Sequence, residues 1–328
     1  MASNYLKAVI PAAGKGVRLA KLTRKYPKPM LKFNGKPLLE HILNSIKEIG
    51  IKDIIIVVGY KGKQIMKYFS DGSRFDLNIT YVFDKKISGT ATAIKAAENE
   101  IDSTFLMVFG DVYPEPSLLK SLIEKHIDAK TKLGTRLVAT LAVTKVNDPF
   151  NHAPILFKND EVLEIWSNKS SWVDMGIMIL EPTIFKAIEY TPLIRGEFRI
   201  LKSIDIAMKW GYKVIAHKST NPWVQIGDHR GVLSLIETNN YFLRKTGLNN
   251  YIEDSIIISS QLSKTSVMKS IIINSKLNNC IVYDGAKVIS SVLENCVVDE
   301  GVHINNCLLY TSDAADDGES VDVGGRRI

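Results

Sequence analysis

The chain has 328 residues, of which 45% are hydrophobic and 23% charged, and it carries a formal net charge of +7. No apolar run reaches the length of a membrane span, and no apolar signal-peptide segment precedes the first strand-like residues. Three cysteines, at positions 280, 296 and 307, are too few for a disulfide framework and lack zinc-site spacing. These features indicate a globular protein of two domains, without a membrane partner, and we expect it to act in the cytoplasm.

From Lys7 to about residue 245, short β-rich runs alternate with longer amphipathic ones. The strand-like runs KAVIPA, DIIIVVGY, ITYVFD and TFLMVFGD are separated by helical patterns such as PLLEHILNSIKEIGI and TATAIKAAENEI. This alternation predicts an α/β domain at residues 1–245: a Rossmann-like, mixed and mostly parallel sheet flanked by helices. Ligands of such sheets bind beyond the carboxyl ends of the strands. Because the glycine loop, Asp84 and Asp111 all follow predicted strands, we expect them to share one site.

Residues 246–306 change to a repeating pattern. SIIISSQL at 255–262 recurs as SIIINSKL at 270–277, and CIVYDGAKV at 280–288 recurs as CVVDEGVHI at 296–304. Such spacings of 15, 10 and 16 residues between short aliphatic runs predict a solenoid of stacked strands. The pattern resembles a left-handed β-helix of hexapeptide-like repeats, truncated after about three coils. Cys280 and Cys296 are then stacked core residues rather than nucleophiles.

The segment 307–328 differs in composition from everything before it. Its sequence, CLLYTSDAADDGESVDVGGRRI, is acidic, rich in small residues and without hydrophobic periodicity. It resembles the translation of an adapter used in sequencing libraries, and a natural disordered tail is the alternative. We expect a non-native tail here and a natural chain that continues beyond residue 306. Without the five acidic residues and two arginines of this segment, the net charge becomes +10.

The loop after the first strand is cationic and contains two glycines. It lacks the third glycine of a dinucleotide fingerprint, since Leu19 stands there, and it lacks the G-K-[ST] ending of a P-loop. Backbone amides can bind phosphates or base edges, and arginine adds bidentate charge. Pro27 and Pro29 restrict the backbone around a lysine. A solvated basic loop is the alternative, but the combination favours nucleotide binding by Ala12, Ala13, Gly14, Gly16, Arg18 and Lys28.

This region resembles the signature of the sugar-1-phosphate nucleotidyltransferases, also called nucleotide-diphospho-sugar pyrophosphorylases. The matching runs are AAGKGVRL, PKPML and GKPL, followed by Gly59-Tyr60, Gly89-Thr90-Ala91 and Gly110-Asp111. The resemblance covers nearly all of residues 7–306. It implies transfer of a nucleoside monophosphate from a nucleoside triphosphate to a sugar 1-phosphate, with release of pyrophosphate. Archaeal and bacterial members with a C-terminal β-helix, some carrying an acyltransferase activity there, are the most similar.

The resemblance also implies roles for individual residues. Arg18 would stabilise the departing β- and γ-phosphates, Lys28 would hold the attacking phosphate, and Asp111 would ligate Mg²⁺. Such chemistry depends mainly on positioning and on neutralisation of charge. A turn role is the alternative for Asp111. The nucleotide itself would contact Ala12, Ala13, Gly14, Gly16, Gly89 and Thr90.

Asp84 is at the position that meets the base edge in this family. Because a carboxylate only accepts hydrogen bonds, it suits the two adjacent N–H groups of guanine better than the single N–H of uracil or thymine. A structural aspartate at the start of a loop is the alternative. The sequence leaves the base open between guanine and a pyrimidine.

The sequence departs from the family pattern in the metal site and on the sugar side. Gln225 replaces a second metal-binding acid in the run WVQIG, and it would ligate Mg²⁺ without bringing charge. The E-K-P segment that grips the sugar is replaced by WSNK at 166–169, and the tyrosine–glycine step by HAP at 152–154. Asp174 is still available for a sugar hydroxyl.

These departures leave two hypotheses. The first is an active enzyme that uses an unusual sugar, and the second is a catalytically weak or inactive paralogue that binds nucleotide as a regulatory or scaffold subunit. The presence of Arg18, Lys28 and Asp111 together favours the enzyme. The expected partners are a nucleoside triphosphate and a sugar 1-phosphate, and no specific nucleic acid, because the basic residues gather at the loop. A homo-oligomer formed through the β-helix is also open.

Overall fold

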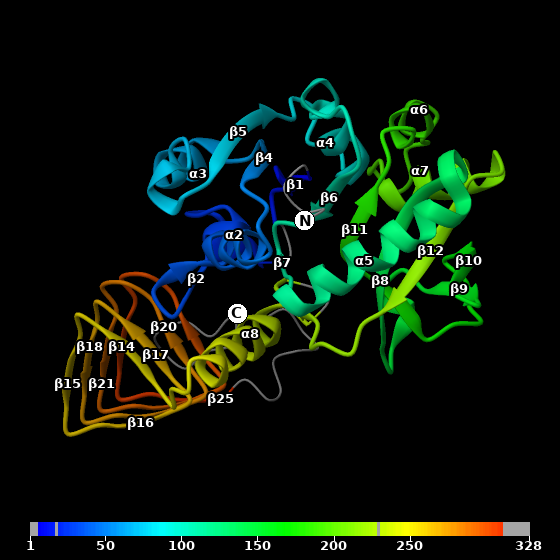
Figure 1. Ribbon diagram of the computed structural model, residues 1–328. Helices are drawn as coiled ribbons and strands as arrows, with labels where there is room; N and C mark the ends of the chain where they lie inside the picture. The colour runs from blue at the N-terminus through cyan, green and yellow to red at the C-terminus, as the bar shows by residue number, and fades with distance from the viewer. Residues whose placement is uncertain (1–5, 17–18, 228–229, 311–328) are drawn as a thin grey trace. The chain divides into compact units, whose positions relative to one another are not determined.

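The computed structural model describes residues 6–16, 19–227 and 230–310 (Figure 1). By its contacts the chain divides into two compact units. We call Met1–Lys15, Tyr26–Met30 and Leu38–Trp223 the sheet unit, and Gly16–Lys25, Leu31–Pro37 and Val224–Ile328 the β-helix unit. Residues 224–245 and two short N-terminal segments thus group with the C-terminal repeats, and the predicted domain boundaries at residues 245 and 306 stay predictions.

In the described residues, the sheet unit is built on nine strands in the order β5-β4-β1-β6-β11-β8-β12-β10-β9. Strands β5, β4, β1 and β6 are parallel to one another, whereas β11 is antiparallel to both β6 and β8. The predicted mixed sheet is therefore confirmed: β5, β4, β1 and β6 form one parallel part, and β8 and β12 form a second parallel pair. The strands are β1 (Lys7–Ala12), β4 (Asp53–Val58), β5 (Asn78–Phe83), β6 (Phe105–Val108), β8 (Leu137–Lys145), β9 (Ile155–Lys158), β10 (Glu161–Ile165), β11 (Trp172–Leu180) and β12 (Lys213–Lys218), and β7 (Val112–Tyr113) lies outside this sheet.

Helices flank the sheet where the sequence shows helical spacing of apolar residues (Figure 1). The longest, α5, has Pro116 in its first turn and is followed by Gly134 with a φ of 58°, which are common start and stop signals. No helix among the described residues is long and apolar enough to span a membrane. The helices of this unit are α2 (Leu38–Glu48), α3 (Gly62–Phe69), α4 (Thr90–Ala96), α5 (Pro116–Leu133), α6 (Ile184–Glu189) and α7 (Ile200–Lys209), with short 3₁₀ turns η3 (Lys28–Met30), η4 (Ser73–Phe75), η5 (Glu98–Glu100), η6 (Gly134–Arg136) and η7 (Pro149–Asn151).

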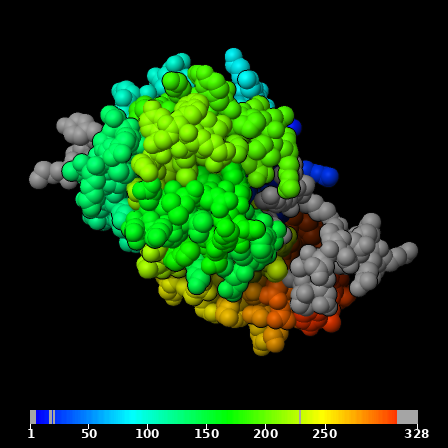
Figure 2. Space-filling view, turned by 90° about the vertical axis from the view of Figure 1, so that its right-hand side faces the viewer, coloured from blue at the N-terminus to red at the C-terminus, as the bar shows by residue number. Residues whose placement is uncertain are grey.

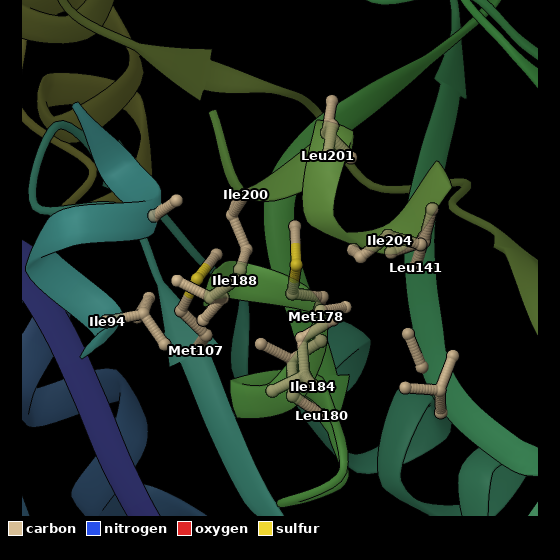
Figure 3. Packing of buried hydrophobic residues seen from close by; sticks show 14 of the residues in the cluster. Ile94, Met107, Leu141, Met178, Leu180, Ile184, Ile188, Ile200, Leu201 and Ile204 are labelled. Carbon is tan, nitrogen blue, oxygen red and sulfur yellow. The ribbon is translucent and has the colours of Figure 1, made fainter. Parts of the chain in front are cut away.

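A continuous core joins the middle strands of the sheet to α4, α6 and α7 (Figure 3). Met107 of β6 and Met178 of β11 are fully buried there and pair across the two strands. Each buried side chain of this size contributes about 1.5 to 3 kcal/mol relative to exposure. In the space-filling view the residues drawn in green form one continuous surface (Figure 2). The core therefore fixes β6 and β11, whose ends carry candidate site residues.

The β-helix unit contains, in its described residues, three parallel sheets of four strands each. This arrangement confirms the predicted left-handed β-helix and adds a fourth level to the three expected coils. The added level includes β25 (Leu308–Tyr310), which lies in the segment predicted to be a tail; residues 311–328 of that segment are outside the described residues. The other strands are β14 (Tyr251–Glu253), β15 (Ile256–Ile258), β16 (Gln261–Ser263), β17 (Ser266–Met268), β18 (Ile271–Ile273), β19 (Lys276–Asn278), β20 (Ile281–Val282), β21 (Lys287–Ile289), β22 (Val292–Glu294), β23 (Val297–Val298) and β24 (His303–Asn305).

Most sides of this β-helix have five residues rather than the expected six. Successive strands begin at residues 251, 256, 261 and 266, so one coil takes 15 residues. A sixth residue occurs at two corners, where Gly285 and Gly301 have φ of 76° and 72°. Cys280 and Cys296 are buried in the β-helix core, as predicted.

The rest of the β-helix unit consists of the N-terminal segments and one long helix. The segments form α1 (Ala20–Thr23) and an antiparallel hairpin of β2 (Lys32–Phe33) and β3 (Lys36–Pro37). The helix α8 (Val232–Lys245) follows β13 (Val224–Gln225). Phe33 packs against Phe242 of α8 with ring centroids 5.9 Å apart, and Asn34 Nδ2 donates to Thr246 Oγ1 at 3.2 Å. The hairpin is thus attached to α8 through both apolar and polar contacts.

Candidate active site

The loops after the parallel strands are held against one another at one edge of the sheet. Tyr60 N donates to Ala13 O at 3.0 Å, and Gly110 N donates to Pro11 O at 3.1 Å. A Cβ on Gly59 would lie 2.9 Å from the Ala13 Cβ, and a Cβ on Gly110 would lie 2.9 Å from Pro11 O. Glycine at these two positions therefore lets the loops after β1, β4 and β6 meet. The edge formed is the one at which ligands of α/β sheets bind.

The glycine loop starts at this edge and continues in the β-helix unit. Gly14 is exposed, does not have a positive φ, and has no atom within 4 Å of the place where a Cβ would stand. The described residues do not require glycine there, and contact of Gly14 with nucleotide stays a prediction. Gly16, in the other unit, has a φ of 64°, and its carbonyl oxygen accepts from Leu19 N at 3.0 Å and Thr23 Oγ1 at 3.1 Å. Arg18 lies outside the described residues.

Two of the three expected catalytic residues are in contact. Lys28 Nζ lies 2.5 Å from Asp111 Oδ2, although 83 residues separate them in the sequence. The side chains are 13% and 23% exposed. Lys28 begins the turn η3, in which Pro29 and Met30 are buried and Met30 N donates to Pro27 O at 2.8 Å. The buried neighbours hold the lysine backbone, so its ammonium group is fixed beside the carboxylate at the carboxyl end of β6.

Asp84 directs its carboxylate into its own loop. Its Oδ1 accepts from Lys86 N at 3.0 Å and Ile87 N at 3.1 Å, and its Oδ2 accepts from Thr92 Oγ1 at 3.0 Å. The residue is 5% exposed. Because both oxygens stabilise the loop 84–92, this geometry favours the structural alternative over guanine recognition. Thr92, which sequence reasoning missed, could have been noticed as a hydroxyl eight residues beyond the aspartate.

Gly89 and Thr90 connect the start of α4 to a distant segment. Gly89 has a φ of 122°, and a Cβ on it would lie 2.4 Å from Phe198 O. Ala91 N donates to Phe198 O at 2.9 Å, and Thr90 Oγ1 accepts from Ile200 N at 2.9 Å. Both residues therefore have a structural reason for their identity, and contact with nucleotide stays a prediction for them.

Asp174 is a buried acid with an unused oxygen. Its backbone N donates to Ala153 O at 3.1 Å, and its Oδ2 accepts from Gly176 N at 3.1 Å. Its Oδ1 has no hydrogen-bond partner among the described residues. Burial raises the pKa of Asp174 to about 7, against the smaller opposing effect of the Gly176 hydrogen bond. A buried acceptor without a partner is costly unless a ligand supplies a donor.

A bulge in β11 brings Asp174 to the same edge as Asp111. The pairing of β11 with β8 is irregular between Asp174 and Met178. Gly176, with a φ of 76°, allows this bend, because a Cβ there would lie 2.4 Å from the ring of Phe109. Phe109 N donates to Gly176 O at 2.9 Å, which ties the bulge to the residue two positions before Asp111. In the sequence, the glycine two residues after Asp174 indicated this bulge. Nothing in the sequence indicated the contact with Phe109.

An aromatic pair stands where the family pattern is altered. Trp223 Nε1 donates to Met175 O at 3.1 Å, next to Asp174 in the chain. The ring of His152 lies 4.8 Å from that of Trp223 at an interplanar angle of 60°. His152 precedes Ala153, which binds the Asp174 backbone. The side of the site assigned to the sugar therefore contains an acid, an imidazole and an indole.

The donor set for a metal ion is sparse. No group of three or more histidine, cysteine, aspartate or glutamate residues that could hold a metal occurs in the described parts of the chain. Asp111 belongs to the sheet unit, and Gln225 belongs to β13 of the β-helix unit, where it is half-buried between Val224 and Ile226. Oxygen donors of these two types are ones that a hard cation such as Mg²⁺ accepts, and their role as metal ligands stays a prediction.

An open α/β sheet with a glycine loop after its first strand, and a lysine–aspartate pair at the same edge, defines a class of proteins that bind phosphorylated nucleotides. Comparison with protein families agrees with this class. The family model described as nucleotidyl transferase matches residues 7–244, and the chain belongs to this family.

Curated relatives differ in length from this chain. The bifunctional protein GlmU of Methanocaldococcus jannaschii is 29% identical over 265 residues, which are 78% of this chain and 60% of the relative. The UTP–glucose-1-phosphate uridylyltransferase AglF of Haloferax volcanii is 31% identical over 219 residues, which are 64% of this chain and 87% of the relative. The chain thus spans about 60% of the length of the GlmU relatives that it matches.

Solved structures support the fold. A UDP-glucose pyrophosphorylase complexed with UDP-glucose has a TM-score of 0.63 at 22% identity, covering 73% of this chain and 99% of that one. A putative glucose-1-phosphate thymidylyltransferase from Bacillus anthracis has a TM-score of 0.61 at 24% identity, covering 72% and 94%. At these identities the likeness concerns the architecture of the chain.

Proposed function

We propose that this protein transfers a nucleoside monophosphate from a nucleoside triphosphate to a sugar 1-phosphate. An oxygen of the sugar phosphate attacks the α-phosphorus, the bond from the α-phosphorus to the bridging oxygen breaks, and pyrophosphate leaves. The observation that carries this proposal is the contact of Lys28 with Asp111 at the carboxyl end of β6. Membership of the nucleotidyl transferase family supports the proposal, and so does the similarity to the UTP–glucose-1-phosphate uridylyltransferase of Haloferax volcanii.

The residues of this chain act mainly by position and charge. Backbone amides near Gly14 bind phosphate oxygens, and Lys28 neutralises the attacking phosphate as it approaches a second anion. Arg18 stabilises the departing pyrophosphate. Asp174 accepts a hydrogen bond from a sugar hydroxyl through its unused Oδ1. Because the acceptor is buried, a sugar without a donor at that position is rejected strongly.

A divalent metal ion is general in this family, and we propose Mg²⁺ for this protein. Asp111 and Gln225 would hold it together with phosphate oxygens and water, and it would neutralise charge on the triphosphate.

We infer a pyrimidine nucleotide, UTP or dTTP, as the donor rather than GTP. The carboxylate of Asp84 already accepts from Lys86 N, Ile87 N and Thr92 Oγ1, so it holds its own loop together and is not reserved for a base edge. The similar proteins include a uridylyltransferase and a putative thymidylyltransferase, which also supports a pyrimidine nucleotide. We also place the reaction in the cytoplasm, because its nucleotide substrate is available there.

A second candidate function is a regulatory subunit that binds nucleotide without turnover. Gln225 in place of an acid favours it, because an amide brings no charge to a metal site. Pyrophosphate release, measured over a panel of nucleoside triphosphates and sugar 1-phosphates with Mg²⁺, distinguishes the two. Release with at least one pair, lost in Asp111→Ala and retained in the exposed control Asp128→Ala, supports the enzyme. Nucleotide binding without release by any pair supports the regulatory subunit.

We further propose that the protein self-associates through one face of the β-helix. The outward positions of β15, β18 and β21 are mostly isoleucine, and two of them are about half exposed: Ile256 at 55% and Ile258 at 49%. The outward residues of β15 and β18 are all isoleucine, whereas β21 adds Lys287, and an apolar face of this kind can pack against the same face of a second copy. Replacing Ile256 and Ile273 by Asp should reduce the mass measured by light scattering to that of one chain. Gln261→Asp, on an adjacent face, should not change it, and an unchanged mass in the isoleucine variant contradicts the proposal.

A further inference from the structure

Two acidic residues of the β-helix bind lysines from the N-terminal part of the chain. Asp284 Oδ2 lies 3.1 Å from Lys32 Nζ, and Glu300 Oε1 lies 2.6 Å from Lys25 Nζ. All four residues belong to the β-helix unit. The two acidic side chains are 28% and 27% exposed.

The acids occupy equivalent positions in successive coils. Ile281 pairs with Val297, a step of 16 residues, and the same step relates Asp284 to Glu300. Each acid directly precedes a corner glycine, Gly285 or Gly301, at the only described sides with a sixth residue. Gly301 N donates to Asp284 O at 3.0 Å, which stacks one corner on the other. The two six-residue sides of the β-helix therefore contain both the acids and the glycine turns next to them.

The two lysines stand close to the ends of one functional segment. The chain leaves the β-helix unit after Lys25 and re-enters it at Leu31, and the segment between them is Tyr26–Met30. That segment carries Lys28. Lys25 is the last residue before it, and Lys32 is the second residue after it. Chain continuity therefore couples the corners of the β-helix to both ends of the turn that holds Lys28.

Further contacts within the β-helix unit hold the hairpin that follows the segment Tyr26–Met30. A Cβ on Gly35 would lie 2.2 Å from Tyr251 Oη in the first strand of the β-helix, so the hairpin packs closely there. Together with the Phe33–Phe242 contact, this places the hairpin firmly on its own unit. On the Lys25 side, the contacts include the bond to Glu300 and the turn in which Lys25 N donates to Leu22 O at 3.4 Å.

We propose that Asp284 and Glu300 are positioning residues for Lys28. They fix the ends of the segment Tyr26–Met30, so that the ammonium group of Lys28 is preorganised for the phosphates before substrate arrives. The kinetic consequence rests on the proposed nucleotidyl transfer, whereas the structural consequence does not. The β-helix therefore takes part in the transfer reaction by holding a catalytic lysine in place.

The test compares Asp284→Asn combined with Glu300→Gln against Glu294→Gln. Glu294 is a matched control, because it lies in the same β-helix and its Oε1 accepts from Asn278 Nδ2 at 3.3 Å rather than from a lysine. Hydrogen exchange followed by mass spectrometry on peptides that cover residues 22–33 is the first readout. Because partly exposed ion pairs are individually weak, we expect exchange about threefold to tenfold faster in the double variant, and no change in the control.

The kinetic readout uses the same variants. We expect kcat for pyrophosphate release to fall about threefold to tenfold in the double variant while the melting temperature of the β-helix stays close to that of the wild type. Exchanging the charges, with Lys32→Asp and Asp284→Lys together, should restore the slow exchange that Asp284→Lys alone removes.

The outcomes separate this inference from the proposed function. Unchanged exchange at residues 22–33 in the double variant overturns the inference, whatever the activity. Faster exchange with unchanged kcat also overturns it, because the segment would then be anchored without effect on Lys28. If the wild-type protein releases no pyrophosphate, the proposed function fails, and the exchange data alone decide whether Asp284 and Glu300 anchor the segment.

Discussion

Replacing Asp174 by asparagine should make the protein more stable at alkaline pH and weaken its interaction with sugar. The carboxyl group is 7% exposed, and only one of its oxygens is hydrogen-bonded in the described residues. Burial disfavours its charged form and raises its pKa from 3.8 to about 7. Asparagine has nearly the same shape and no charge, so it removes the titration while keeping the acceptor for Gly176 N.

The magnitude follows from linkage. For an acid whose folded pKa is raised, the stabilising contribution is complete below the unfolded pKa and is lost as the pH rises through the folded pKa. A shift from 3.8 to about 7, at about 1.4 kcal/mol per unit, corresponds to about 4 kcal/mol lost between pH 4 and pH 7. The new amide N–H lacks a partner, which costs about 1 to 3 kcal/mol at every pH. The variant should therefore exceed the wild type by about 1 to 3 kcal/mol at pH 8.

The assay is urea unfolding followed by circular dichroism at several pH values from 4 to 8. The difference in unfolding free energy between variant and wild type should grow by about 4 kcal/mol over this range and then become constant. Asp128→Asn, at an exposed position of α5, is the control and should show no such growth. A difference that is independent of pH would refute the assignment of a raised pKa to Asp174. The Michaelis constant for sugar 1-phosphate should also lose its pH dependence near 7 in the variant.

Three further predictions concern other parts of the sheet unit. Burial opposes ionisation of Glu181, but hydrogen bonds from neighbouring side chains outweigh this effect and lower its pKa to about 2. The free energy of unfolding of the wild type should therefore fall by about 3 kcal/mol as the pH drops from about 4.5 to 2. In urea titrations, Glu181→Gln should abolish this pH dependence. Gly89→Ala should cost about 3 kcal/mol or more, seen as a lower melting temperature, because its Cβ would overlap Phe198 O at a φ of 122°. Lys28→Gln should remove the ammonium group that contacts Asp111. Calorimetry should then detect up to about tenfold tighter Mg²⁺ binding to the nucleotide-free protein. Equal affinity in the variant and the wild type would argue against competition between the lysine and the metal.

Features that depend on local pattern could be predicted from the sequence. Apolar runs such as DIIIVV form strands, and the aliphatic repeat after residue 250 forms the β-helix, because side-chain burial in both is periodic along the chain. The glycine loop, Lys28 and Asp111 also fall where the motif and the ends of the strands place them. Position at the edge of a sheet requires only the order of strands and loops.

Features that depend on contacts between distant segments could not be predicted. The engagement of Asp84 with Ile87 requires a φ of 47° at that residue, which no local pattern encodes. The tight fit of Gly89 depends on Phe198, more than a hundred residues later.

The N-terminal hairpin contacts residues near the C-terminal end of the described chain, and these contacts can form only after those residues have been translated. Asn34 and its partner Thr246 are separated by 212 residues, and Lys32 and Asp284 by 252. A ribosome adds roughly 5 to 20 residues each second, so the lysine waits on the order of ten seconds or more before its acid is synthesised. The nascent chain can complete its large sheet during that interval. If Asp284 and Glu300 position Lys28 as proposed, nucleotide should bind efficiently only after the coils that carry these two acids have been synthesised.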